Sequence, residues 1–99
     1  MVHRDLKHDN ILVEIDAEHE DGSEFIVCKL TDFGMAFEDD KQQNHNEICG
    51  TDTFMAPEVV RGQNQDTKVD IWSLGVLTFI MLTNTAPFHG AGQRLRDNI

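Results

Sequence analysis

The sequence predicts an α+β fold in which a β-hairpin precedes several helices. Two observations support this prediction. Residues 10–15 and 25–30 are short apolar runs, and a polar stretch at 16–23 separates them. Residues 69–82 form a much longer apolar run, and Thr67 just before it is suited to capping a helix that extends to about Leu82. Strand-like runs followed by helix-like runs are typical of the α+β class.

The first apolar run, residues 10–15, predicts a short buried strand. Residues 16–23 then predict the loop of a hairpin, and residues 25–30 predict the returning strand. Residues 34–53 are mostly polar and show no sustained period, so they predict a long loop. A loop of this length inside a compact domain usually has a function.

Three helices are predicted in the second half of the chain. Pro57 can open a short helix that runs to Arg61. Residues 67–82 are apolar on nearly every side, which predicts a helix buried on all sides. A chain of 99 residues can hardly surround such a helix, and we take this as a first sign of a fragment. Residues 90–99 predict the start of another helix.

Composition excludes some classes of function. The chain has 8 basic and 18 acidic residues, so its net charge of −10 argues against binding to nucleic acid or to an anionic membrane. Cys28 and Cys49 form no CxxC motif, which favours free thiols in a reducing compartment. No apolar signal region opens the sequence, and the run at 69–82 is too short and too polar to span a bilayer. We therefore expect a cytoplasmic or nuclear protein.

Four motifs follow one another along the chain. They are His3-Arg4-Asp5-Leu6-Lys7-His8-Asp9-Asn10, then Asp32-Phe33-Gly34, then Gly50-Thr51 leading to Ala56-Pro57-Glu58, and finally Asp70-x-Trp72-Ser73-x-Gly75. A single triplet would carry little weight, but all of them in this order and spacing are highly specific. In these motifs the sequence resembles the eukaryotic protein kinase family, over residues 3–88 and weakly beyond. Lys7 and Thr51 favour the serine/threonine type.

The resemblance assigns catalytic roles to three residues. Asp5 resembles the aspartate that accepts the proton of the substrate hydroxyl. Lys7 resembles the lysine that steadies the transferring phosphate, and a compact ammonium suits that role. Thr51 resembles the threonine that touches the base and helps to define a hydroxyl acceptor. Taken alone, Asn10 and Asp32 would be explained as turn residues. The ordered set of motifs favours the functional interpretation for Asp5, Lys7, Asn10 and Asp32 only.

The resemblance also implies ATP and Mg²⁺ as cofactors. Asn10 and Asp32 resemble the pair of metal ligands, and their oxygens suit a hard cation. Lys7, Asn10 and Asp32 would therefore contact the nucleotide or its metal ion, while Leu12 resembles the residue that lies beneath the adenine. The implied reaction is transfer of the ATP γ-phosphate to a serine or threonine hydroxyl of a protein substrate.

The fold implied by the resemblance is the mainly helical C-terminal lobe of a kinase, with short β-hairpins. Residues 1–99 would be a partial kinase domain, with the catalytic loop at 3–10, the activation segment at 32–58, the central buried helix at about 67–82 and the next helix from about 90. The region around 68–88 looks most like the calcium/calmodulin-dependent kinases.

The sequence contains no G-x-G-x-x-G loop and no V-A-I-K strand lysine ahead of the catalytic loop. We therefore expect the isolated chain to be inactive and to need the missing lobe or a partner for stability. The alternative is a non-catalytic kinase remnant that acts as a binding module or as a decoy for a complete kinase.

Two positions depart from the kinase pattern in ways that bear on regulation. Glu47 stands where an activation-loop phosphate is usual, so it could pair with Arg4 and partly replace a phosphate. The alternative is that Glu47 is a solvated loop acid. Asp52 replaces a usual proline and is expected to add a negative charge near the acceptor pocket.

Overall fold

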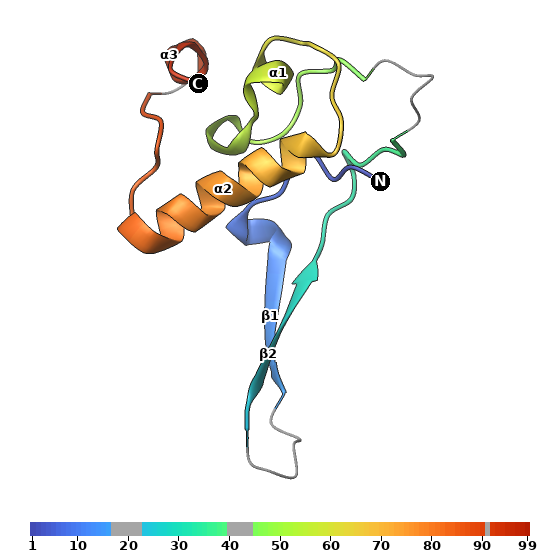
Figure 1. Cartoon of the computed structure of the whole chain (residues 1–99), viewed down its shortest axis with the longest axis vertical. Helices are drawn as coiled ribbons and strands as arrows, with labels where there is room; N and C mark the ends of the chain where they lie inside the picture. Colours follow the sequence, from blue (N-terminus) through green and yellow to red (C-terminus); the bar gives the residue numbers. More distant parts are fainter. Residues whose placement is uncertain (17–22, 40–44, 91) are drawn as a thin grey trace.

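The computed structural model describes residues 1–16, 23–39, 45–90 and 92–99. Most of the predicted hairpin loop at 16–23 lies outside these residues. The described elements are a 3₁₀ turn η1 (His8–Asn10), strands β1 (Ile11–Asp16) and β2 (Phe25–Leu30), a second 3₁₀ turn η2 (Asp52–Phe54), and helices α1 (Pro57–Val60), α2 (Lys68–Thr83) and α3 (Gln93–Asp97). The predicted α+β class is confirmed (Figure 1).

Strands β1 and β2 form an antiparallel hairpin that projects away from the helices (Figure 1). The prediction of a buried strand at 10–15 is wrong, because Val13 and Ile15 are 61% and 66% exposed. Ile26, the partner of Ile15, is 69% exposed. The apolar pattern correctly indicates a strand, but no second layer of the described structure packs against this part of the hairpin.

The resemblance predicts more than one short hairpin, and in this respect the described residues differ. They contain one hairpin and one isolated antiparallel bridge between Val2 and Phe37. The bridge is closed by two backbone hydrogen bonds, from Val2 N–H to Phe37 O at 2.8 Å and from Phe37 N–H to Val2 O at 3.0 Å. It joins the start of the catalytic loop to the segment after β2.

The long helix α2 begins directly after Thr67, the predicted cap position, but the capping hydrogen bond comes from another residue. The Thr67 side chain makes no capping hydrogen bond. Instead the Asp66 carboxylate accepts the Lys68 N–H at 2.8 Å, which also places a negative charge at the positive end of the helix. The helix ends at Asn84, whose φ of 56° is the left-handed conformation expected of an asparagine at this position.

Helix α2 is buried along one stripe and exposed elsewhere, which differs from the prediction of burial on all sides. The buried residues Val69, Ser73, Val76 and Leu77 recur at helical spacing. Met81 and Leu82, by contrast, are 76% and 82% exposed. The molecule is only 17 Å thick along its shortest axis, so it has too few layers to enclose the helix. No helix in the described part of the chain is long and apolar enough to cross a membrane.

The core lies where α1, α2 and Val2 meet. One cluster joins residues from four segments: Val2, Met55, Ala56, Val59 and Val69. A second cluster joins Phe54 to Val76 and Leu77 on α2. Trp72 packs against both clusters. Val2, which directly precedes the predicted catalytic loop, and the segment before α1 are therefore both packed against α2.

Candidate active site

The catalytic loop is anchored to α2 by a single carboxylate. Asp70 accepts the backbone N–H of His3 at 2.8 Å and that of Arg4 at 2.9 Å. Arg4 has a φ of 67°, a conformation that non-glycine residues adopt only when their surroundings enforce it. The anchored turn directs the next residue, Asp5, into the interior.

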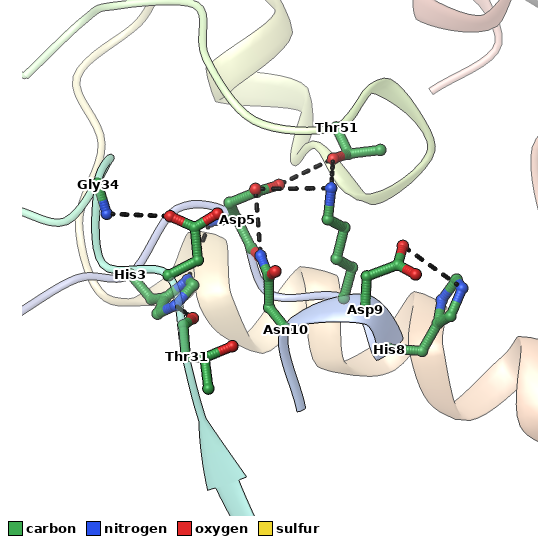
Figure 2. A network of polar contacts seen from close by, with 10 residues as sticks. His3, Asp5, His8, Asp9, Asn10, Thr31, Gly34 and Thr51 are labelled. Atoms are coloured by element: carbon green, nitrogen blue, oxygen red, sulfur yellow. Dashed lines mark hydrogen bonds and ion pairs between the residues drawn. The ribbon is translucent and has the colours of Figure 1, made fainter. Parts of the chain in front are cut away.

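Asp5 lies at the centre of a polar network made by residues far apart in the sequence (Figure 2). The Thr51 hydroxyl donates to Asp5 Oδ1 at 2.8 Å, and Lys7 Nζ donates to Thr51 Oγ1 at 2.8 Å. Lys7 Nζ also lies 3.7 Å from Asp5 Oδ2. Asn10 Nδ2 donates to Asp5 Oδ2 at 3.2 Å and to the Asp5 backbone oxygen at 2.8 Å. The structure thus brings four of the six predicted site residues together.

The network is largely shielded from solvent. Asp5 is 8% exposed and Asn10 is 6% exposed. A carboxylate in such surroundings needs charged and hydrogen-bonding partners, and Lys7, Asn10 and Thr51 supply them. The arrangement holds a negatively charged oxygen pair in a fixed orientation beside one positive charge.

Asp32 is exposed, unlike Asp5 and Asn10. Its φ of 58° marks a tight reversal of the chain, and its Oδ1 accepts the Gly34 N–H at 3.4 Å. The adjacent Phe33 packs edge-on against His3, with 4.9 Å between ring centroids. His3 Nε2 is within 2.9 Å of the Thr31 backbone oxygen (Figure 2). His3 therefore ties the segment that carries Asp32 to the catalytic loop.

Thr51 reaches Asp5 because the preceding residue is a glycine. Gly50 has a φ of 104°, and a Cβ at this position would lie 2.6 Å from the Arg4 backbone oxygen. On the other side, the Ser73 hydroxyl of α2 donates to the Phe54 backbone oxygen at 2.8 Å and holds η2 in place. The backbone around Thr51 is thus fixed between the catalytic loop and α2.

Leu12 does not join the other predicted site residues. It lies on β1 and is 54% exposed, outside the polar network. Asp52, which is expected to add a negative charge near the acceptor pocket, forms an ion pair in the structure. Arg96 of α3 pairs with the Asp52 carboxylate at 3.0 Å.

The predicted pairing of Arg4 with Glu47 is present in the structure. Arg4 Nη2 lies 3.5 Å from Glu47 Oε2, and the Arg4 side chain is 8% exposed while that of Glu47 is 77% exposed. Arg4 Nε also donates to the Met35 backbone oxygen at 2.6 Å, and its guanidinium lies 4.9 Å from the centre of the Phe37 ring. Close by, burial raises the pKa of the Cys49 thiol above its ordinary value, which favours the protonated thiol.

Sequence reasoning assigns no site role to two residues that the structure places in support of the site. Asp70 belongs to a recognised motif, so its position is visible in the sequence, but its bonds to His3 and Arg4 are not. Gln65 is 2% exposed and belongs to none of the four motifs. An isolated glutamine in a polar loop gives no sequence signal of burial.

Comparison with known proteins agrees with the motifs. The protein kinase domain family matches residues 1–98. The chain is 40% identical over 99 residues to the serine/threonine-protein kinase AtPK2/AtPK19 of Arabidopsis thaliana, covering 100% of this chain and 19% of that protein. It is 45% identical over 92 residues to the serine/threonine-protein kinase DCLK1 of Rattus norvegicus, covering 93% of this chain and 20% of that protein.

A third relative is the ribosomal protein S6 kinase alpha-6 of Danio rerio, 46% identical over 91 residues that make up 91% of this chain and 11% of the relative. The chain therefore spans about a fifth or less of the length of these relatives. The family match covers nearly the whole chain, and the first two of these relatives are serine/threonine kinases by name. The chain belongs to the eukaryotic protein kinase family, within its serine/threonine group.

Proposed function

We propose that this chain is part of the C-terminal lobe of an ATP- and Mg²⁺-dependent protein kinase that phosphorylates serine or threonine hydroxyls of proteins. The observation that supports it most strongly is the convergence of Lys7, Asn10 and Thr51 on the Asp5 carboxylate. Phosphoryl transfer depends on positioning and on charge neutralisation, and this network supplies a fixed carboxylate and a cation next to each other.

In this proposal Asp5 accepts the proton of the substrate hydroxyl. A carboxylate offers about four lone-pair sites. The bonds from Asn10 and Thr51 orient Asp5 without using all of them. Lys7 stabilises negative charge on the transferring group, and its ammonium is already held beside Asp5. Thr51 links the two, because its hydroxyl accepts from Lys7 and donates to Asp5.

The donor set near Asp5 fits a magnesium ion bound together with nucleotide phosphates. Asn10 uses its amide nitrogen for Asp5, which leaves its carbonyl oxygen as the ligand atom, and Asp32 contributes an exposed carboxylate. The described residues contain no cluster of three or more His, Cys, Asp or Glu side chains able to hold a metal by themselves. Such an ion would need ligands from ATP, as is usual for Mg²⁺. When bound, the ion neutralises phosphate charge.

The same proposal makes the isolated 99-residue chain inactive. Leu12, assigned to the adenine, is 54% exposed on β1. The sequence also lacks the glycine-rich loop and the strand lysine that would complete the nucleotide site. A missing lobe or a partner would have to supply these parts and to cover the exposed apolar surface. The free thiols of Cys28 and Cys49 support a cytoplasmic or nuclear setting.

Glu47 supports a further part of the proposal, namely its role as a partial substitute for an activation-loop phosphate. Its carboxylate faces Arg4, the residue immediately before the proposed base. One negative charge replaces nearly two, so the substitute is weaker than a phosphate. Glu47 is largely solvated, which limits the strength of the pair further.

The deciding experiment is a phosphoryl-transfer assay on the full-length protein that carries this sequence, using radiolabelled ATP and a serine/threonine protein substrate. We expect Asp5→Asn to lower kcat by about 10²–10⁴-fold, the range typical of a lost general base. The matched control is Asp9→Asn, since Asp9 lies in the same loop but its side chain is 66% exposed and pairs with His8. An Asp5→Asn variant with unchanged activity would contradict the proposal.

Calorimetry and turnover assays on the full-length protein separate this proposal from the alternative of a non-catalytic remnant. Both expect the isolated chain to bind no ATP–Mg²⁺. They differ in the full-length protein, where nucleotide binding and turnover are expected only for the enzyme. A full-length protein that binds neither nucleotide nor metal would favour the remnant.

A further inference from the structure

The activation segment is attached to the turn after α1 by three hydrogen bonds. Gln65 Nε2 donates to the Glu47 backbone oxygen at 2.7 Å. The Gln65 backbone N–H donates to the His45 backbone oxygen at 2.9 Å. The His45 N–H in turn donates to Asn64 Oδ1 at 3.1 Å. Residues 45 and 47 are therefore held at three points by two consecutive residues of one turn, beside which this segment runs (Figure 1).

A glycine at the start of the turn lies against the activation segment and has a backbone conformation that favours glycine. Gly62 has a φ of 60°, and a Cβ at this position would lie 3.4 Å from the Asn46 backbone oxygen and 3.8 Å from the Ile48 side chain. Asn46 and Ile48, the two neighbours of Glu47, therefore lie against Gly62. The attachment is a packed contact and not one isolated hydrogen bond.

Gln65 is buried to a degree that is unusual for its residue type. It is 2% exposed and is the largest of the fully buried side chains of the described chain. Glutamine is mostly found at the surface, because burial of its amide costs free energy unless both ends are hydrogen-bonded. Here Oε1 is buried without a hydrogen-bond partner among the described residues. The bond from Nε2 to Glu47 is therefore the polar contact that offsets part of the cost.

The consequence reaches the catalytic loop through Glu47. The Glu47 side chain is 77% exposed, so few contacts of its own fix its position. Its backbone is fixed by Gln65, and from there its carboxylate reaches Arg4 Nη2 at 3.5 Å. Arg4 also contacts Met35 and Phe37, and it therefore stays in place when Glu47 is changed.

We propose that Gln65 is a positioning residue of this site. By holding the Glu47 backbone it keeps the Glu47 carboxylate within reach of Arg4, and so it holds the activation segment against the loop that carries Asp5. This inference rests on the proposed kinase function and on the proposed role of Glu47. It assigns Gln65 no contact with substrate or nucleotide. Its effect is exerted through Glu47.

The test uses Gln65→Leu in the full-length protein, since leucine keeps most of the volume and removes the donor. The matched control is Gln63→Leu, because Gln63 lies two residues away in the same turn and is exposed. We expect Gln65→Leu to lower kcat by about three- to tenfold, the range of a modest coupling between residues in one network. Gln63→Leu is expected to leave kcat unchanged.

A double-mutant cycle with Glu47→Gln distinguishes positioning from a general loss of stability. If Gln65 acts through Glu47, then Gln65→Leu lowers kcat in the parent protein but not in the Glu47→Gln background. A purely structural role lowers kcat by the same factor in both backgrounds and overturns the inference. An unchanged kcat in Glu47→Gln overturns it as well. If Gln65→Leu does not fold, Gln65→Met, with a longer and more flexible side chain, carries the same cycle.

Amide hydrogen exchange gives a readout that needs no activity. We expect Gln65→Leu to increase exchange in a peptide covering residues 45–50 and to leave a peptide from the middle of α2 unchanged. Equal protection of residues 45–50 in the parent and the variant overturns the inference even in an active kinase. A parent protein without phosphoryl transfer contradicts the proposed function instead, and exchange then still decides whether Gln65 holds the segment.

Discussion

The catalytic loop and the β1–β2 hairpin are neighbours in the sequence, yet they differ in what surrounds them. In the loop His3, Asp5 and Asn10 are each less than 9% exposed, although all three are polar. In the hairpin Val13, Ile15 and Ile26 are each more than 60% exposed, although all three are apolar. Burial here follows tertiary contacts, such as those of His3 with Asp70 and of Asp5 with Thr51, and not hydrophobicity.

The register explains why the exposed hairpin is incomplete. Ile11 pairs with Leu30, Val13 with Cys28, and Ile15 with Ile26, so each of these pairs places its side chains on one face of the ribbon. That face is entirely apolar. A two-stranded hairpin is marginal in water unless a further layer covers such a face. Only the start of the hairpin is covered, where Ile11 packs against the cluster of Phe54, Val76 and Leu77, and the described structure leaves Val13 and Ile15 open.

The largest effect on the contrast between the catalytic loop and the hairpin is expected from a substitution of Asp70, which fixes the loop to α2. Asp70→Ala removes the acceptor of two backbone N–H groups, those of His3 and Arg4. Leaving both N–H groups without a partner should lower the free energy of unfolding by about 2–5 kcal/mol. Urea denaturation of the full-length protein measures the loss. The control is Asp39→Ala on an exposed segment, and an equal loss in both variants would contradict the proposed anchor.

Two glycines offer the next test, because one lies in the packed region and the other on the open face of α2. Gly50→Ala introduces a Cβ 2.6 Å from the Arg4 backbone oxygen at a φ of 104°, which should cost about 3 kcal/mol and displace Thr51 from Asp5. A Cβ added at Gly75 would meet no other segment of the described chain within 4 Å, so Gly75→Ala should stabilise α2 by about 0.5–1 kcal/mol.

We test this comparison by measuring the thermal unfolding midpoint and the kcat of the two variants. The expected pattern is a lower midpoint and lower kcat for Gly50→Ala, with a slightly higher midpoint for Gly75→Ala. A destabilised Gly75→Ala protein would mean that another segment packs on the open face in the full-length protein.

The smallest effect is expected from trimming the hairpin of the 99-residue chain. Val59→Ala removes two buried methyl groups and should cost about 2 kcal/mol, whereas Ile15→Ala, at a position 66% exposed, should cost less than about 0.5 kcal/mol. Amide hydrogen exchange measures the two changes separately, at the Val2–Phe37 bridge for Val59→Ala and in β1 for Ile15→Ala.

The same pair tests the proposed covering lobe. In the full-length protein we expect Ile15→Ala to cost about 2 kcal/mol as well, since the lobe would bury it. A cost below about 0.5 kcal/mol in both forms would contradict a covered hairpin.

Much of the fold and of the site could be predicted from local pattern. Alternation and apolar runs located β1, β2 and α2 to within one or two residues, and the motif order located Asp5, Lys7, Asn10 and Thr51. The sequence pattern failed where the burial of a strand or the capping of a helix depended on contacts with another residue or segment. Burial of residues 10–15 required a second layer, and the cap of α2 required a choice between Asp66 and Thr67 that only backbone geometry makes.

The sequence by itself determined the family and the chemical groups of the site, because these depend on residue types at fixed spacing. The tertiary structure decided which groups meet. Asp5 and Thr51 are 46 positions apart and His3 and Asp70 are 67 apart, and only packing on α2 brings each pair within hydrogen-bond distance. The proposed role of Gln65 depends wholly on the tertiary structure. Its side chain matters because the turn after α1 places it against Glu47, and no local pattern encodes that contact.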